Sequence, residues 1–573
     1  MTPSPSSHRE WRQFVLLSKD SVRRLIASAT FARDADPMQF ALWAVALAAI
    51  PPAFYAFSQM FTYVVLRQAP AEVVERVVVS DRVFFIVYAM LASALLAAFT
   101  WDALFPDKQD QEIVGVLPVR PRTLAAARLA GAVVVAAAYA LAIGVPGGVV
   151  FAFISTAHPA VGFLPTVFAA HVLATFFACL FTFFGLLVLR GVVTFCGGAR
   201  LAQRFAAGLQ FLTVVGIVEV FFFLPGVLPA LVKRVLAGEP GASALPPVWF
   251  AALDSLIVGS NQPVLIANAR IAIGAFIASA VLVVGVYLVP ARIVGRRALE
   301  ESPTDRAGRF RRLPQFASSV LLSAPRARAV AAFAMTSLLR NRRHALIVAS
   351  YLGMAIAIGI VGLLAAGLHG TFSMAQPTPA LLALPLVMMF FMVLGLRSAF
   401  TVPTDLDANW IFRLSAPGVP IAAGATTAVM AGSVVLPVAL LGGLAGMISG
   451  WNASTIVAMV AFDLSAGWLL VACAVYGCTK VPFACAHMPA TETMKSRWPV
   501  LVVALYLYAF KLADLQFAAM PSVTRTVADV AILSMAGGAV TLLGWRTARR
   551  STLQFDVGPE DSAATLSLSE ALH

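Results

Sequence analysis

Charged residues are scarce in this chain. Asp, Glu, Lys and Arg make up 12% of its 573 residues, whereas 60% of the residues are hydrophobic. Soluble globular chains are about one quarter charged and about half apolar. The composition therefore excludes an ordinary soluble protein and predicts an all-α polytopic membrane protein.

Cysteine and lysine are also few, and the common catalytic motifs are missing. The five cysteines show no metal-ligand spacing, so we expect neither a disulfide framework nor a metal site. None of the six lysines follows a glycine, which excludes the phosphate-binding loop G-x4-G-K-[ST]. The motifs HExxH and GxSxG are absent too. We therefore expect no enzyme activity and no cofactor bound by this chain.

The sequence shows no cleavable signal and no large soluble domain. Residues 1–37 are polar and basic and lack the central apolar core of a signal peptide. We expect a first transmembrane half at 1–300, a basic cytoplasmic linker at 301–325 and a second transmembrane half at 326–550. The acidic residues 551–573 are expected to be a disordered tail.

Long apolar runs fill most of the chain. A membrane span needs about 20 apolar residues, and about twelve runs meet this requirement. The predicted spans are residues 38–66, 82–104, 124–153, 163–189, 207–231, 271–290, 345–368, 380–401, 421–448, 455–478, 499–519 and 526–545.

The basic residues between these runs set the orientation. If the N-terminus is cytoplasmic, most Lys and Arg side chains fall on the inner side, whereas the opposite orientation violates the positive-inside rule. The net charge of +14 thus reflects topology and does not indicate nucleic-acid binding. We expect a multi-pass protein of a bacterial inner membrane, surrounded by lipid, with both termini in the cytoplasm.

The chain divides into two halves with the same plan. Six apolar runs precede the basic segment 292–344 and six follow it. Each half opens with a basic amphipathic stretch, at 10–27 and 328–344, which predicts a helix at the membrane interface. This order predicts two parallel six-helix repeats, related as a pseudo-dimer about an axis along the membrane normal. The alternative is that any two Ala- and Val-rich halves look alike.

The segments after the second run of each half share a pattern of acids, apolar residues and a proline. In each, a short helix with an apolar face is predicted, capped by an aspartate and stopped near a proline. The first candidate comprises Asp110, Glu112, Ile113, Val116, Leu117 and Pro118. The second comprises Asp407, Trp410, Ile411, Phe412, Leu414 and Pro417. Such a helix lies on its own membrane or fills a groove in a partner; the alternative is a connector packed on neighbouring helices.

The first of these segments resembles a known family. Glu112, Leu117 and Pro118 form a Glu-x4-Leu-Pro motif, and Arg128 is the basic residue that enters the third span. Together with the interfacial helix and the six-span plan, this arrangement resembles the permease subunits of ABC-2 type exporters. The resemblance covers most of the first half. In the second half no acid matches Glu112, and aromatic residues appear instead.

The resemblance implies a role for the segment and for the chain. In that family the loop is a coupling helix, which docks into a cleft of the ATP-hydrolysing subunit. We therefore expect the permease of an ATP-driven exporter, with two ABC ATPase subunits as partners that bind ATP and Mg. Two alternatives stay open: a six-plus-six secondary transporter and a membrane scaffold. The segment between runs two and three lacks the G-x3-D-R-x-G-R-R pattern of the major facilitator family.

Ionisable residues inside the apolar runs mark pathways or charge pairs. They are His171, Glu219, Arg397, Asp463, Lys511 and Asp514. A shift of 292 positions places Glu219 on Lys511 and His171 on Asp463. We hypothesise that at least one of these complementary pairs joins the two halves. For Lys511 a local pair with Asp514, three residues on, is favoured.

The longest expected outer segment is 232–264. Within it, residues 248–258 predict a short helix at the outer surface, with Trp249 at the interface. The resembled exporters often carry re-entrant helices at this position, between spans five and six. The second half has no comparable segment, so an outer gate of this kind would be one-sided.

Overall fold

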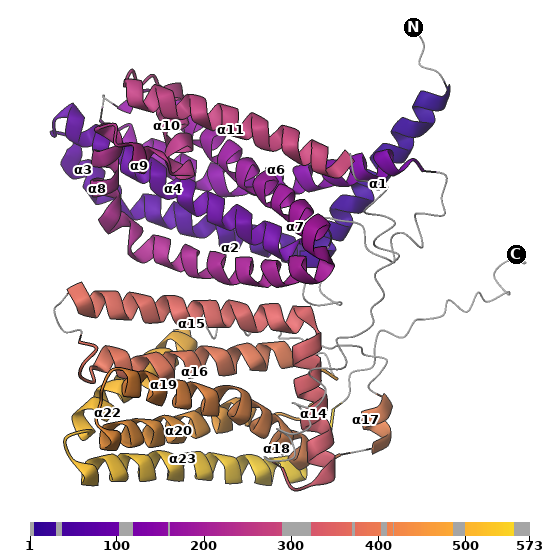
Figure 1. The fold of residues 1–573 in the computed structure, drawn as a ribbon, viewed down its shortest axis with the longest axis vertical. Coiled ribbons are helices and arrows are strands. Elements are labelled where there is room, and N and C mark those ends of the chain that lie inside the picture. Colours follow the sequence, from indigo (N-terminus) through magenta and orange to yellow (C-terminus); the bar gives the residue numbers. More distant parts are fainter. Residues whose placement is uncertain are drawn as a thin grey trace, which may run out of the picture. The chain divides into compact units, whose positions relative to one another are not determined.

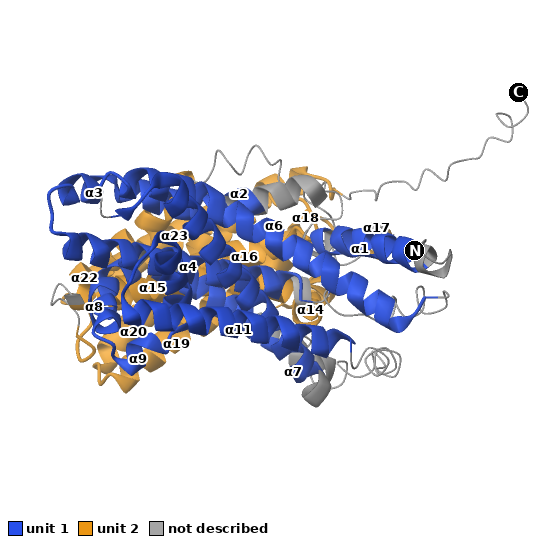
Figure 2. Cartoon of the chain, turned by 90° about the horizontal axis from the view of Figure 1, so that it is seen from above, with its two compact units in different colours: residues 1–302 blue, residues 303–573 orange. Residues whose placement is uncertain are grey.

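Two compact units make up the chain (Figures 1 and 2). The structure is a computed structural model of residues 1–573, and it describes residues 5–29, 37–101, 103, 119–158, 161–288, 322–368, 373–402, 410–415, 417–484 and 499–554. Unit 1 is residues 1–302 and unit 2 is residues 303–573. In the described ranges all regular structure is helical, and eleven helices are long and apolar enough to cross a membrane. The chain is therefore a polytopic α-helical membrane protein.

Unit 1 contains the helices that precede and form the first set of spans. They are α1 (Pro5–Ala29), α2 (Pro37–Ser58), α3 (Met60–Leu66), α4 (Ala71–Phe99), α6 (Pro121–Ser155), α7 (Leu164–Phe222), α8 (Leu224–Leu236), α9 (Pro240–Ser243), α10 (Pro246–Val258) and α11 (Pro263–Leu288). The most enclosed of its candidate spans is α4.

Unit 2 contains α14 (Pro325–Arg340), α15 (Arg342–Leu368), α16 (Pro379–Phe400), α17 (Trp410–Ser415), α18 (Val419–Met430), α19 (Leu436–Ile448), α20 (Ala453–Val475), α22 (Leu512–Ala519) and α23 (Val523–Arg550). Two π-helical turns, η3 (Ala431–Val435) and η4 (Tyr506–Lys511), interrupt its spans. Pro437 explains η3, because its nitrogen cannot donate a hydrogen bond to the carbonyl group of Ser433 and the helix widens there. Like α4 in unit 1, α16 is the most enclosed candidate span of unit 2.

Some helix contacts occur at the same place in the helix order of both units, and others do not. The amphipathic helix before the first span packs on the third span in both units: α1 on α6, and α14 on α18. α7, which holds both the fourth and the fifth expected spans, contacts α4, α6 and α11, and α20, the fourth expected span of unit 2, contacts α16, α19 and α23. The first spans differ, since α2 packs mainly on α6 whereas α15 packs mainly on α16. Figure 1 shows α14 running across one end of unit 2.

The second span of unit 1 begins earlier than the sequence predicts. The prediction started it at residue 82, whereas α4 starts at Ala71. The charged pair Asp81–Arg82 looked like the edge of an apolar run. Both side chains are buried and have polar partners, so the helix continues through them.

Spans four and five were predicted as separate runs at 163–189 and 207–231, but a single helix assignment, α7, extends from Leu164 to Phe222. Cys179 and Gly216 both lie against the same stretch of α4, residues 89–93. In a straight helix these two positions would be about 55 Å apart, so α7 bends back on itself. No proline occurs between 166 and 224 to end the helix. The expected fifth span is thus the returning arm of α7 followed by α8.

The helix expected at the outer surface is present, but it is buried. α10 spans Pro246–Val258 and packs against α4, α7 and α11. One turn of it, Phe250–Ser255, is buried throughout. Being 13 residues long, α10 is too short to cross a bilayer on its own. It is therefore a half-length helix inserted among the spans of unit 1.

Candidate functional sites

The predicted coupling segments are only partly described. The six residues of the first segment, Asp110, Glu112, Ile113, Val116, Leu117 and Pro118, lie outside the described residues. In the second segment Asp407 lies outside them, while Trp410, Ile411, Phe412 and Leu414 lie on α17. Pro417 is buried two residues after the helix ends.

Two apolar side chains of α17 are exposed, and a third packs against α14. The exposed fraction is 52% for Ile411 and 77% for Leu414. Phe412 packs edge-on against Phe333 of α14, with ring centroids 5.0 Å apart. Ile411 and Leu414 are three residues apart and share one face of the helix. α17 is thus a short helix held on α14, with a small apolar face left uncovered.

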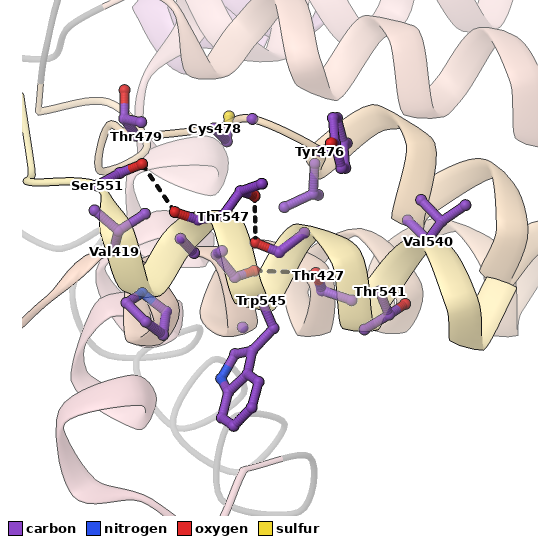
Figure 3. A pocket seen from close by; sticks show the side chains of 18 residues that line it. Val419, Thr427, Tyr476, Cys478, Thr479, Val540, Thr541, Trp545, Thr547 and Ser551 are labelled. Atoms are coloured by element: carbon purple, nitrogen blue, oxygen red, sulfur yellow. Dashed lines mark hydrogen bonds between the residues drawn. The ribbon is translucent and has the colours of Figure 1, made fainter.

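A cavity of about 260 Å³ lies next to the start of α18, directly after α17 (Figure 3). Its walls come from the first half of α18, the end of α20 and the end of α23. The threonine and serine hydroxyl groups on its walls are already used: those of Thr427, Thr547 and Ser551 donate to carbonyl groups of their own helices. Thr541 does the same, and Thr479 donates to Gln554. The cavity surface is therefore mainly apolar and lies next to the segment that leaves α17.

Filling this cavity is expected to stabilise unit 2. A Cβ atom on Gly424 would meet no atom within 4 Å, and leucine is favoured over glycine in a helix by about 1 kcal/mol. We expect Gly424→Leu to raise the free energy of unfolding by about 1 kcal/mol, measured by denaturant unfolding in detergent. The matched control is Gly274→Leu on α11, where a Cβ atom also meets open space but is outside any described cavity. If Gly424→Leu is less stable than Gly274→Leu, the cavity beside Gly424 cannot accept a leucine side chain.

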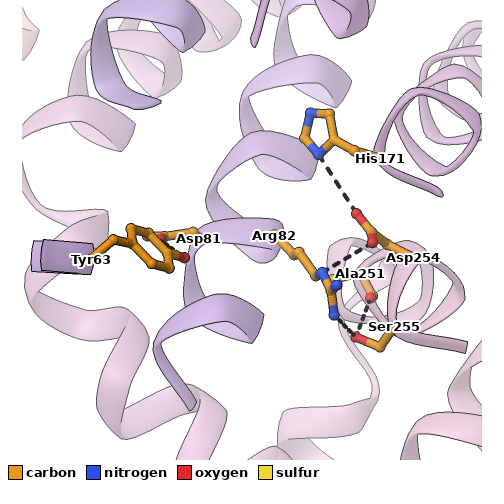
Figure 4. Close-up of polar contacts among 7 residues, drawn as sticks. All are labelled: Tyr63, Asp81, Arg82, His171, Ala251, Asp254 and Ser255. Carbon is orange, nitrogen blue, oxygen red and sulfur yellow. Dashed lines mark hydrogen bonds and ion pairs between the residues drawn. The ribbon is translucent and has the colours of Figure 1, made fainter. Parts of the chain in front are cut away.

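Unit 1 contains a cluster of buried charges (Figure 4). The Arg82 guanidinium group on α4 forms an ion pair with Asp254 on α10, with Nε and Oδ1 3.0 Å apart. Its Nη1 also donates to the Ser255 hydroxyl oxygen at 2.8 Å. The second oxygen of Asp254 lies 3.6 Å from Nδ1 of His171 on α7, a contact that pairs charges only when the imidazole is protonated. These charged side chains are at most 6% exposed.

Asp81, next to Arg82 on α4, has its own partners. The hydroxyl groups of Tyr55 and Tyr63 each donate to one of its carboxylate oxygens, both at 2.8 Å. Tyr55 belongs to α2 and Tyr63 to α3. Asp81 and Arg82 point to different neighbours, as Figure 4 shows. Together, Asp81 and the Arg82–Asp254–His171 cluster fasten α2, α3, α7 and α10 to α4.

The other predicted charges have varied surroundings. Lys511 pairs locally with Asp514 at 3.0 Å, as its spacing suggested, and both side chains are about half exposed. Arg397 is exposed at the end of α16. Glu219 is half-buried on the returning arm of α7. The pairing of Glu219 with Lys511 and of His171 with Asp463 would join the two units and stays a prediction.

The fourth span of each unit places its ionisable residue against a glycine of the third span. His171 lies on Gly148 of α6, where an added Cβ atom would be 2.9 Å from the imidazole. Asp463 of α20 lies on Gly442 of α19, with 3.8 Å to its carboxylate oxygen. His171 has Asp254 beside it, but both carboxylate oxygens of Asp463 lack a hydrogen-bond partner among the described residues.

Sequence reasoning missed Asp81, Arg82 and Asp254. The first two were placed at the edge of a span, and Asp254 was placed in a surface helix. A signal was available, because Asp254 is the only charged residue in 248–258 and Arg82 directly precedes a long apolar run. Isolated charges in apolar helices are usually paired with one another.

These sites belong to a polytopic helical membrane protein with one ionic cluster in unit 1 and one buried carboxyl group in unit 2. Comparison of the chain with protein-family models, curated proteins and solved structures finds no match. The function has to be argued from the geometry of the sites themselves.

Proposed function

We propose that this chain is the transmembrane permease of an ATP-driven exporter of the ABC-2 type, with its ATPase subunits supplied as separate chains. The observation that carries the proposal is α17. Its Ile411 and Leu414 side chains form an exposed apolar face, while Phe412 fixes the helix to α14. A rigidly held helix with apolar anchors at the end of two spans suits the transmission of force from a docked subunit.

The proposal includes two parallel six-helix repeats fused in one chain. Support comes from the shared packing of α1 on α6 and of α14 on α18, and from the Gly148–His171 and Gly442–Asp463 contacts. Such a pseudo-dimer offers one coupling segment per unit, at 110–118 and at α17, and thus places for two ATPase subunits. Unit 1 alone carries an inserted helix like α10, which makes any gate built from it one-sided.

ATP hydrolysis is assigned to the partner because the sequence has no phosphate-binding loop. The proposal puts the spans in a bacterial inner membrane, with α14, α17 and both termini on the cytoplasmic side; the positive-inside rule supports this orientation. Many apolar side chains of these helices are exposed. The charged residues show no pattern that identifies a cargo.

The first test is to purify the chain from native membranes by a tag at its C-terminus and to identify bound proteins by mass spectrometry. The expected result is a stoichiometric ATPase that carries G-x4-G-K-[ST]. A pure preparation that contains no nucleotide-binding protein would overturn the proposal.

A second candidate is a secondary transporter driven by an ion gradient. It is favoured by the buried ionisable groups Arg82, His171, Asp254 and Asp463, since charges inside spans often serve ion pathways. The two functions differ in their energy source. Uptake or efflux in vesicles that respond to a pH gradient without any ATPase would favour this candidate over the exporter.

A further inference from the structure

Asp463 is a buried ionisable group that forms no ion pair with the described residues of unit 2. Its side chain is completely buried on α20. Gly442 of α19 faces it on one side, and Gln516 of α22 faces it on another. Tyr508 of η4 is close enough to Asp463 for the two side chains to interact electrostatically. Asp463 thus lies in a closed space between three helical segments, one of which is a π-helical turn, a feature common at functional sites.

The hydrogen-bond donors near Asp463 are directed at other acceptors. Both carboxylate oxygens of Asp463 and the amide oxygen of Gln516 are buried without a hydrogen-bond partner at bonding distance among the described residues. The Gln516 amide nitrogen donates to the Met459 carbonyl oxygen at 3.5 Å. The Tyr508 hydroxyl group is directed at the Met389 sulfur, 4.0 Å away. The amide oxygen of Gln516 is therefore available to accept a hydrogen bond from Asp463.

No described side chain offers a positive charge to Asp463. The helices packed on α20, together with η4 and α22, carry Arg397, Tyr506, Tyr508, Lys511, Asp514, Arg525, Asp529, Arg546, Arg549 and Arg550 as titratable groups. Every one of these except Tyr508 and Asp529, which are half-buried, is exposed, and Lys511 is paired with Asp514. In unit 1 the residue at the corresponding position, His171, has an ionisable neighbour, because α10 places Asp254 beside it. Unit 2 has only a short turn, 520–522, between α22 and α23 and so has no such partner.

An ionised carboxylate without a partner in this position is energetically costly, because burial removes its solvation. A carboxylate only accepts hydrogen bonds, whereas the protonated acid also has one O–H donor. One proton on Asp463 therefore removes the buried charge and supplies the donor that Gln516 lacks. We propose that Asp463 is a proton-binding site, whose protonated carboxyl group donates a hydrogen bond to the amide oxygen of Gln516.

Binding of this proton makes the packing of unit 2 dependent on pH. While α20 and α22 are packed together, the carboxyl group keeps its proton. When they separate and water enters, the O–H bond breaks, the proton passes to water and the carboxylate becomes solvated. Because the closed arrangement binds one more proton than the open one, rising pH favours opening. This inference is independent of any ATPase partner and holds for either candidate function.

Infrared spectroscopy of the purified full chain in lipid vesicles tests the proposal. The C=O stretch of a protonated carboxylic acid is separate from the bands of carboxylates. At neutral pH we expect a protonated-acid band equivalent to one group per chain, which disappears in Asp463→Asn. The matched control is Asp514→Asn, which removes an ion-paired and half-exposed carboxylate and should leave the band unchanged.

Two further measurements keep the result decisive. Asp463→Asn preserves size and hydrogen bonding, so its thermal unfolding should match that of the wild type and show that it folds. Gln516→Leu should shift the band without abolishing it, because the acid loses its acceptor. A spectrum with no band that depends on Asp463 would overturn the proposal. So would a band that appears only after sodium and potassium are removed, since Asp463 would then bind a metal cation instead of a proton.

Discussion

Replacing Asp254 by alanine is expected to destabilise unit 1 by about 3–5 kcal/mol, the cost of removing one member of a buried ion pair. The loss would leave the Arg82 guanidinium group buried, since its side chain is only 6% exposed, with Ser255 as its sole hydrogen-bond acceptor. It would also remove the carboxylate beside His171. The measurement is the free energy of unfolding in detergent, followed by denaturant titration.

Two controls distinguish the effect of breaking a buried ion pair from the effect of removing any charged side chain. Arg234 and Glu239 form an ion pair at 2.6 Å whose side chains are 60% and 47% exposed, and Glu239→Ala should cost less than about 1 kcal/mol. In the double variant Arg82→Met with Asp254→Leu, no charge is left unpaired, so most of the lost stability should return. Equal effects of Asp254→Ala and Glu239→Ala would show that the cluster does not hold α10 in place.

The contrast between Asp254 and Asp463 is informative about the two units. Both carboxyl groups are completely buried, yet one is neutralised by an arginine and the other has no charged neighbour among the described residues. In unit 1 the inserted helix α10 brings the carboxylate itself, and its counter-charge is Arg82 of α4. Asp463 has no such arginine among the described residues, so a proton is the simplest way to neutralise it. The two sites therefore solve the same electrostatic problem with different means.

Hydropathy and amphipathicity alone predict much of this fold. Long apolar runs yield helices because backbone groups in lipid must be satisfied within the segment. The ends of α6, α16 and α20 lie within about three residues of the predicted ends. The amphipathic stretches at 10–27 and 328–344 form the greater part of α1 and α14. The short helix around Trp410 was also predicted, from its apolar spacing and from Pro417.

Features that depend on tertiary contacts escape such reasoning. Hydropathy predicts that Asp81 and Arg82 lie at the edge of a span, because it contains no information on their partners. The partners are two tyrosines for Asp81 and Asp254 for Arg82. It also cannot place α10, whose apolar sequence fits an interfacial helix as well as a buried one. The bend in α7 has no proline to mark it. In each case the missing information is the identity of a partner far away in the sequence.

Replacing Leu414 by aspartate is expected to abolish binding of the ATPase subunit to unit 2, if α17 is a coupling helix. Leu414 is 77% exposed and lies at the tip of the apolar face. An apolar anchor at the centre of an interface contributes about 2 kcal/mol or more, and a buried charge adds a desolvation cost, so affinity should fall by roughly 30-fold or more. The measurement is the amount of ATPase that co-purifies with the tagged chain.

The exposed position of Leu414 makes this result interpretable. Since the side chain has few contacts within its own chain, Leu414→Asp should leave the thermal unfolding of unit 2 unchanged. Met374 provides a control, because it is 56% exposed between α15 and α16, at the end of these spans opposite to α14. Met374→Asp should retain the ATPase in full. Retention by both variants would mean that α17 is a connector, and the first coupling segment, 110–118, would then have to carry the docking alone.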